Sequence, residues 1–286
     1  MSPRPDAVLR GITDDGAFRV IAAETSDTVK GAVESQGITG DLSRTLGDLV
    51  TGAILVRESM APDFRVQAIL QGDDGKSRLV ADTYPDGMTR GLVQLAKDAK
   101  AFTLEGSGVL QIARSLANGT IHQGIVSVPG TGSISSALMA YMQESEQVVT
   151  MIAVATVLGD DGAVKAAGGY LVQLLPEVVE GPLMVMTERL KDFENIEPLL
   201  RRGAASPKEL LDEILYGMAY TEVGDRSVHF GCTCSPARLA ASLSMLSKED
   251  IEEMLSEKKV LDVECDYCKR KFEFHPEQLR GLLDSN

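Results

Sequence analysis

An Asp-Asp-Gly turn recurs between runs of apolar and β-branched residues, and it constrains the fold more than any other feature of the chain. The three copies lie in "VLRGITDDGAFRVIAA", "VQAILQGDDGKSRLVA" and "MIAVATVLGDDGAVKAAGGYLVQLL". Asp-Gly supplies the positive φ angles of a tight hairpin turn, so each copy predicts a pair of antiparallel strands. A fourth hairpin is predicted in "VLQIARSLANGTIHQGIVSV", with its turn at Asn118 and Gly119.

Helical stretches lie between these hairpins. "SRTLGDLVTGAILVRESM" and "SISSALMAYMQESEQ" are the longest of them. Strands and helices in mixed runs, without strict βαβ alternation, favour an α+β domain built on antiparallel sheet over residues 1–176. The segment "GTGSIS" (130–135) lacks the third glycine of a dinucleotide-binding loop, and we expect it to cap a helix that begins near Ser133.

The chain changes character from about Pro176 to His229. "EGPLMVMTERLKDFENIEPLLRRGAASPKELLDEILYGM" has apolar residues at helical spacing, and Ser206 with Pro207 is typical of a helix start. We therefore interpret this segment as a helical connector. The simplest role for its methionines is to pack on the first domain, because a single apolar stripe is normally a core contact.

All four cysteines lie in the last 55 residues, in a "CTC" and a "CDYC" motif. This segment has too few apolar residues for a stable core of its own, and the cysteines could staple it. Two cysteine pairs at such spacing are typical ligands of structural zinc. The sequence therefore predicts one zinc ion, held by Cys232, Cys234, Cys265 and Cys268.

The histidines are not needed for this site. With four thiolates available, His275 is predicted to be a surface residue. His122 and His229 have no partner that spacing identifies.

The chemistry of the cysteines leaves alternatives open. A zinc ribbon without any redox role has the same spacing. A disulfide across a CxC motif would be strained and readily reversed, as a redox sensor requires. Upon oxidation we expect Cys232 to pair with Cys234 and Cys265 with Cys268, because loop closure is cheapest over short separations. A thiol oxidoreductase would leave the CxC pair unexplained and lacks its βαβ context.

Charge and motif content exclude several classes of function. The net charge of −14 disfavours broad attachment to nucleic acid or to an anionic membrane. The longest apolar run, "VVTMIAVATVL", has 11 residues, and the N-terminus lacks the apolar segment of a signal peptide, so we expect a cytoplasmic protein. Without a nucleophile elbow, an HExxH motif or a phosphate-binding loop, we expect neither an enzyme nor a nucleotide-binding protein.

Several segments resemble one known family over almost the full length of the chain. "CTCS" and "CDYC" match its zinc motifs, and "SEQVVT" (145–150) and "AAGGYLVQLLP" (166–176) look like two segments of its core domain. The chain thus resembles the redox-regulated holdase chaperones of the heat-shock protein 33 family. It departs from the usual pattern in "PARL" after "CTCS" and in His229, where arginine is usual.

The resemblance implies a three-part protein. Residues 1–176 would form an α+β core of packed antiparallel β layers with helices, one of them buried. Residues 177–231 would be the helical linker, and residues 232–286 a zinc-binding redox switch. The reduced, zinc-bound form would be inactive.

Oxidation would then form the disulfides, release zinc and unfold the switch and the linker. The protein would bind unfolding client proteins without ATP, as a homodimer, with linker 177–231 as a suspected client-binding segment. The alternative is a zinc-ribbon protein that binds nucleic acid or ribosomes and whose cysteines are purely structural.

Overall fold

The structure is a computed structural model, and it forms two compact units, Met1–Phe230 and Gly231–Asn286. It describes residues 5–99, 101–116, 118–130, 132–176, 178–203, 206–256 and 260–283. Within these residues, no helix combines the length and the apolar character that crossing a membrane requires.

The first unit contains a five-stranded antiparallel sheet, here called sheet A. Its order is β10-β1-β2-β9-β8, with bounds β1 (Ala7–Thr13), β2 (Phe18–Glu24), β8 (Thr150–Leu158), β9 (Val164–Leu174) and β10 (Tyr220–Ser227). Two of the predicted hairpins, β1–β2 and β8–β9, are confirmed. Gly16 and Gly162 in their turns have φ angles of 70° and 75°. These are the positive angles that the Asp-Gly turns predict.

A six-stranded sheet, sheet B, lies opposite. Its order is β11-β5-β4-β3-β6-β7, with bounds β3 (Arg65–Gln71), β4 (Arg78–Thr83), β5 (Met88–Gln94), β6 (Val109–Ser115), β7 (Ile121–Ser127) and β11 (His229–Phe230). The predicted hairpins β3–β4 and β6–β7 are both confirmed. Only the β11–β5 pair of this sheet is parallel.

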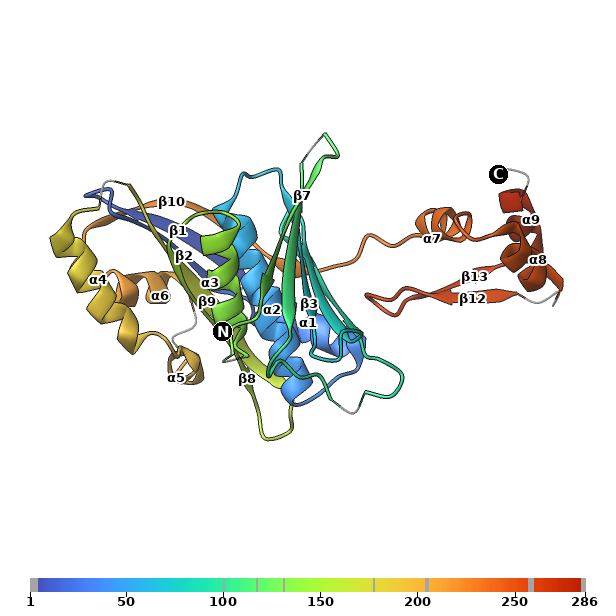
Figure 1. Cartoon of the computed structure of the whole chain (residues 1–286), viewed down its shortest axis with the longest axis horizontal. Helices are drawn as coiled ribbons and strands as arrows, with labels where there is room; N and C mark the ends of the chain where they lie inside the picture. The colour runs from blue at the N-terminus through green and yellow to red at the C-terminus, as the bar shows by residue number, and fades with distance from the viewer. Residues whose placement is uncertain are drawn as a thin grey trace. The chain divides into compact units, whose positions relative to one another are not determined.

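Helix α2 (Asp41–Ser59) lies between the two sheets and is the buried helix that the resemblance implied (Figure 1). Leu46, Leu49 and Ile54 are fully buried there, in one apolar cluster with the inward residues of both sheets. Helices α1 (Ser26–Gln36) and α3 (Ile134–Glu144) complete the core. Ser133 caps α3 as predicted, and Thr131 of the "GTGSIS" segment lies outside the described residues.

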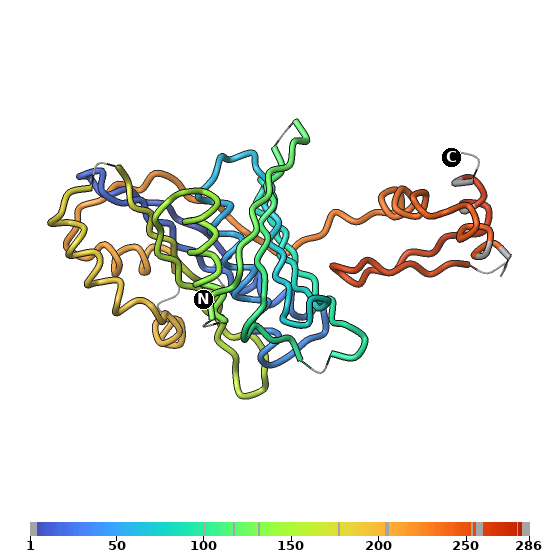
Figure 2. The backbone as a smooth tube through the Cα atoms, in the orientation of Figure 1, coloured from blue at the N-terminus to red at the C-terminus, as the bar shows by residue number. Residues whose placement is uncertain are grey.

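Sheet A is apolar on its other face too, and the linker helices cover that face (Figure 2). These are α4 (Glu180–Asp192), α5 (Glu197–Arg201) and α6 (Pro207–Ile214). Ser206 and Glu209 form a capping box at the start of α6, which confirms the predicted helix start. Met186 is buried on the sheet whereas Met184 is 62% exposed, so only part of the methionine stripe is core. Glu177, where the predicted linker begins, lies outside the described residues.

The last residues before the second unit form strands that the sequence did not suggest. β10 carries charged residues and few β-branched ones, and it joins sheet A because β1 offers it a free edge. β11 follows and pairs with β5. Phe230 lies against Gly31, where a Cβ would come within 2.6 Å of its ring. The chain is therefore tied to the core up to Phe230.

The second unit is small and has little apolar interior. Its elements are α7 (Pro236–Leu243), α8 (Lys248–Ser256), β12 (Leu261–Glu264), β13 (Lys271–Phe274) and α9 (Pro276–Leu283). Ile251, Cys265 and Phe274 are its buried apolar side chains among the described residues. A core of this size agrees with the expectation that the unit needs a staple.

Candidate metal centre

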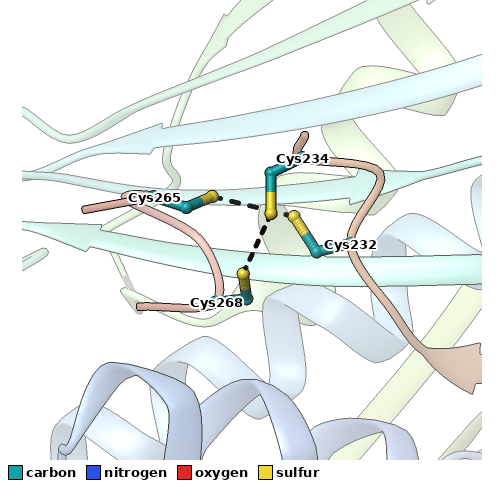
Figure 3. A group of neighbouring side chains, drawn as sticks. All are labelled: Cys232, Cys234, Cys265 and Cys268. Carbon is teal, nitrogen blue, oxygen red and sulfur yellow. Dashed lines mark hydrogen bonds between the residues drawn. The ribbon is translucent and has the colours of Figure 1, made fainter. Parts of the chain in front are cut away.

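The four cysteines that the sequence singled out lie together in the second unit (Figure 3). Their Sγ atoms are all within 4.8 Å of one another. The Sγ atoms of Cys232 and Cys265 are 3.8 Å apart, and those of Cys234 and Cys268 are 3.4 Å apart. Each of these contacts joins the "CTC" motif to the "CDYC" motif, so the cluster links the start of the unit to the turn between β12 and β13.

A tight turn between β12 and β13 positions the second cysteine pair. The Cys265 N–H donates to the Arg270 carbonyl at 2.9 Å, and the Lys269 N–H donates to the Cys265 carbonyl at 2.8 Å. Lys269 has φ 57°, the left-handed conformation that closes such a turn. These bonds hold Cys265 and Cys268 on one turn with their thiols converging.

Helix α7 positions the first pair. The Ser235 hydroxyl accepts a hydrogen bond from the Arg238 N–H and caps the helix, and Pro236 occupies its first turn. The Arg238 guanidinium also donates to the Thr233 hydroxyl, between the two cysteines. The unusual "PARL" segment thus supplies its own contact to the "CTC" loop.

The cluster fits a tetrahedral metal site. Four sulfurs at about 2.3 Å from one ion lie about 3.8 Å from each other, close to the two separations above. Burial raises the pKa of the Cys234 thiol, with the neighbouring thiols adding to the effect, and burial also raises that of Cys268. Thiolates packed this closely require a counter-charge, which a divalent cation would supply. The four cysteines are therefore positioned to hold a metal ion.

The histidines lie elsewhere. His275 is exposed at the start of α9, and its backbone N–H donates to the Gln278 side chain at 2.8 Å. His122 is exposed on β7 and His229 on β11. The cysteine cluster contains no histidine.

Comparison with known proteins agrees with this fold. The family model described as Hsp33 protein matches residues 6–275. The chain belongs to the Hsp33 family. It is 30% identical to the 33 kDa chaperonin of Syntrophotalea carbinolica, over 97% of this chain and 99% of that one. The 33 kDa chaperonin of Bacillus subtilis is 27% identical over 98% of both chains.

A solved structure of the same family has a similar fold. It is the 33 kDa chaperonin, heat shock protein 33 homolog, of Thermotoga maritima, with 25% identity, a TM-score of 0.82 and 99% of each chain covered. The predicted fold class and the predicted family are therefore both confirmed.

Sequence reasoning missed the residues on which the linker helices sit in this Hsp33 protein. A Cβ at Gly168 of β9 would come within 3.3 Å of the Leu200 side chain of α5. A Cβ at Gly11 of β1 would come within 2.8 Å of Leu211 on α6. Glycine inside a strand often marks a close approach of another segment, and that signal was available in the sequence.

Polar contacts also join the linker helices to the core. Arg44 of α2 donates to the Thr156 carbonyl at 3.1 Å and contacts the Glu197 carboxylate of α5 at 3.3 Å. The Tyr170 hydroxyl donates to the Phe193 carbonyl at 3.0 Å. Beside Arg44, burial raises the pKa of Asp48 to about 7.

Proposed function

We propose that the protein is an ATP-independent holdase that oxidation activates. In the reduced form, Cys232, Cys234, Cys265 and Cys268 hold one zinc ion and the protein is inactive. Oxidation pairs Cys232 with Cys234 and Cys265 with Cys268, releases zinc, and unfolds residues 232–286 and the linker 177–231. The exposed surface then binds unfolding client proteins and prevents their aggregation.

The cysteine cluster is the observation that carries this proposal. It joins two motifs inside a unit with very few buried apolar side chains. The metal site exists only in the folded unit, so the free energy of metal binding stabilises the fold directly. For structural zinc this contribution is on the order of 10 kcal/mol. The loss of zinc therefore removes more stability than the unit could have unaided.

The linker offers a surface suited to varied clients. Val179, Leu183, Met184 and Val185 are exposed large apolar side chains at the start of α4. Flexible methionine-containing surfaces can adapt to many partners. Unfolding of the linker would add the side chains that now pack on sheet A, including Met186 and Leu211. Linker 177–231 is therefore the proposed client-binding segment.

The proposal also includes the location of the protein and its partners. A thiol cluster that must stay reduced suits the cytoplasm, where disulfides are rare. The chain would act without nucleotide, without nucleic acid and without membrane attachment, as a binding protein and not an enzyme, and two oxidised chains would associate as a homodimer.

One experiment tests the proposal. Zinc content and suppression of thermal aggregation of an unrelated protein are measured before and after treatment with peroxide at elevated temperature. We expect about one zinc per chain and no suppression before oxidation, and loss of zinc with strong suppression afterwards. Retained zinc and unchanged suppression would instead favour a structural zinc ribbon. A salt-dependent shift of RNA mobility by the reduced protein would then support the nucleic-acid alternative.

Hydrogen exchange tests the unfolding step separately. We expect residues 177–286 to lose amide protection upon oxidation while the hairpins before Pro176 keep theirs. A linker that stays protected in active, oxidised protein would mean that clients bind a preformed surface of the core.

A further inference from the structure

A small cavity opens between the two sheets, at the end of the core where helix α2 ends. It has a volume of about 150 Å³. Arg19 and Gln173 line it from sheet A, Arg114 lines it from sheet B, and Glu146 lines it from the residues after α3. Glu146 lies in "SEQVVT" and Gln173 in "AAGGYLVQLLP", the two core segments that led to the family resemblance. The proposed function uses neither segment.

Three polar side chains form a row on the inner face of sheet A at this end of the core. Arg19 of β2 is paired with Gln173 of β9, and Gln173 is paired with Thr150 of β8. Side chains alternate between the two faces of a strand, so the row shares a face with Ile21 and Leu171 of the main apolar cluster. Polar side chains on a core face are normally hydrogen-bonded, so this row requires partners.

Each residue of this row has a buried polar atom that forms no hydrogen bond with any described part of the chain. These atoms are Arg19 Nε, Gln173 Oε1 and Thr150 Oγ1. The Arg19 side chain is nevertheless held in place, because one terminal nitrogen donates to the Ser59 carbonyl at 2.7 Å. A buried polar atom without a partner lowers stability, so the protein alone does not satisfy this row.

The cavity also carries a positive charge without a counter-charge. Among the residues that the structure describes, Arg19 forms no ion pair. Burial lowers the pKa of Arg19, and the like charge of Arg10 adds to this effect. Glu146 is already engaged, since the Arg114 guanidinium donates to its carboxylate at 2.7 Å and the Tyr141 hydroxyl donates to it at 2.6 Å. An anion in the cavity would therefore meet an arginine that no carboxylate of the described chain neutralises.

The rest of the cavity wall is apolar. It consists of Met60, Phe64, Met142 and Val148, with Ser59 and Ala61 beside them. Sites for small molecules typically combine such a wall with a few polar groups that fix the orientation of the ligand. A cavity of this volume holds a molecule of about six non-hydrogen atoms.

We propose that this cavity binds a small 2-hydroxycarboxylate. The carboxylate neutralises the Arg19 guanidinium, the hydroxyl group donates to the side-chain oxygen of Gln173, and a short aliphatic group contacts the apolar wall. Arg19 and Gln173 are direct cross-strand neighbours, and the Cβ atoms of such neighbours lie about 5 Å apart. This separation suits two ligand groups on adjacent carbon atoms.

Two other occupants fit the cavity less well. Water would satisfy the unpaired atoms but would leave the charge of Arg19 without a counter-charge. A 2-amino acid would bring an ammonium group close to Arg19 and Arg114, although Glu146 is already engaged. All residues of the site belong to the first unit and none is a cysteine, so the site does not depend on the proposed function.

Methyl NMR of the reduced, zinc-loaded full chain, labelled at its methionine methyl groups, tests the site. Met60 and Met142 line the cavity, whereas Met184 is exposed on α4 and serves as an internal control. Lactate should shift the Met60 and Met142 signals with a dissociation constant on the order of 1 mM, as expected for a ligand of about six non-hydrogen atoms. The Met184 signal should not move.

Two relatives of lactate separate the charge from the hydroxyl group. Lactamide lacks the charge and should bind at least about tenfold more weakly than lactate. Propionate lacks the hydroxyl group and should bind about fivefold more weakly. Met60 and Met142 signals that stay unchanged up to about 50 mM lactate would show a cavity filled by water alone and would overturn the proposal. Equal binding of lactate and lactamide would overturn it too.

Variants test the two recognition residues. Arg19→Gln removes the charge and should weaken lactate binding at least about tenfold. Gln173→Met removes the amide oxygen and should lower the affinity for lactate to that for propionate, while propionate binding stays unchanged. Arg78→Gln, at an exposed position of β4, is the matched control and should bind lactate as the wild type does. Wild-type affinity for lactate in Arg19→Gln or in Gln173→Met overturns the assignment. If either variant fails to fold, the three ligands compared on the wild type still decide it.

Discussion

Leu211 of the linker lies directly on Gly11 of the core sheet, with no room for a side chain between them. A Cβ at position 11 would come within 2.8 Å of the Leu211 Cδ2 atom and within 3.0 Å of the Tyr220 ring. Leu211 is fully buried in this position. The packing of helix α6 on sheet A therefore depends on the absence of a side chain at Gly11.

Gly11→Val should loosen the linker in the reduced protein. The added side chain must displace Leu211, and overpacking of this kind costs about 1–3 kcal/mol. If linker release exposes the client-binding surface, the reduced, zinc-loaded variant should suppress aggregation without peroxide. Light-scattering assays with and without peroxide measure this, and hydrogen exchange over α6 reports the docking.

Gly106→Ala provides the control for this prediction. A Cβ at Gly106 meets no atom within 4 Å, so the variant should behave as the wild type does. Full protection of α6 in Gly11→Val would show that the linker tolerates the added side chain, against our expectation.

The four-thiolate assignment predicts a sharp loss of zinc affinity in Cys268→Ser. A hydroxyl is a much poorer zinc ligand than a thiolate, and the remaining three sulfurs leave the site open. Competition with a chelator should show affinity lowered by at least about tenfold. His275→Ala should leave the affinity nearly unchanged, because His275 is not part of the cluster. Full zinc retention in Cys268→Ser would contradict the assignment.

The disulfide pairing of the oxidised form can be read by peptide mapping. We expect Cys232 linked to Cys234 and Cys265 to Cys268, because short loops close at the least entropic cost. In the structure, however, the Sγ contacts are between the two motifs: Cys232 contacts Cys265, and Cys234 contacts Cys268. Mapping that finds mainly these cross-motif pairs would show that the folded cluster, and not loop length, directs oxidation.

The sequence predicted the local parts of the fold well, since the information for them is local. Three Asp-Gly turns and one Asn-Gly turn specify the four predicted hairpins within the chain segments that form them. The order of the hairpins in the sheets depends on contacts between distant residues, as in the pairing of β2 with β9. β10 was missed because its charged sequence shows no strand pattern, and only the free edge of β1 makes it a strand.

The same distinction holds for the candidate site. Cysteine spacing was sufficient to group the four thiols. Which sulfurs lie nearest depends on the turn at Lys269 and on the Arg238–Thr233 contact, neither of which spacing reveals. The close packing of α6 on Gly11 depends on Leu211, which is distant in the sequence. An isolated glycine in a predicted strand indicates that another segment packs closely there, but the sequence does not show which segment it is.

Asp48 predicts a pH dependence of stability in the first unit. Burial raises the pKa of its carboxyl group to about 7, an effect that Glu197 increases and that Thr156 and Arg44 oppose. A carboxyl whose pKa is higher in the folded than in the unfolded state contributes stability below its unfolded pKa of about 4. That contribution is lost progressively as the pH rises from about 4 to about 7, because the unfolded chain ionises there while the buried carboxyl group of the folded protein keeps its proton.

Asp48→Asn removes this titration, since the amide has similar shape and no charge. At pH 5 the variant should be more stable than the wild type by only about 1.5 kcal/mol, because only the unfolded carboxyl group has begun to ionise there. At pH 8 the variant should be more stable, by at most about 4 kcal/mol for a shift of about three pH units. Thermal unfolding of the reduced full chain between pH 5 and pH 8 measures the difference, and Asp98→Asn, at an exposed position, is the control. A stability difference between wild type and Asp48→Asn that does not change with pH would show that Asp48 stays ionised over this range, with Arg44 supplying enough counter-charge to offset its burial.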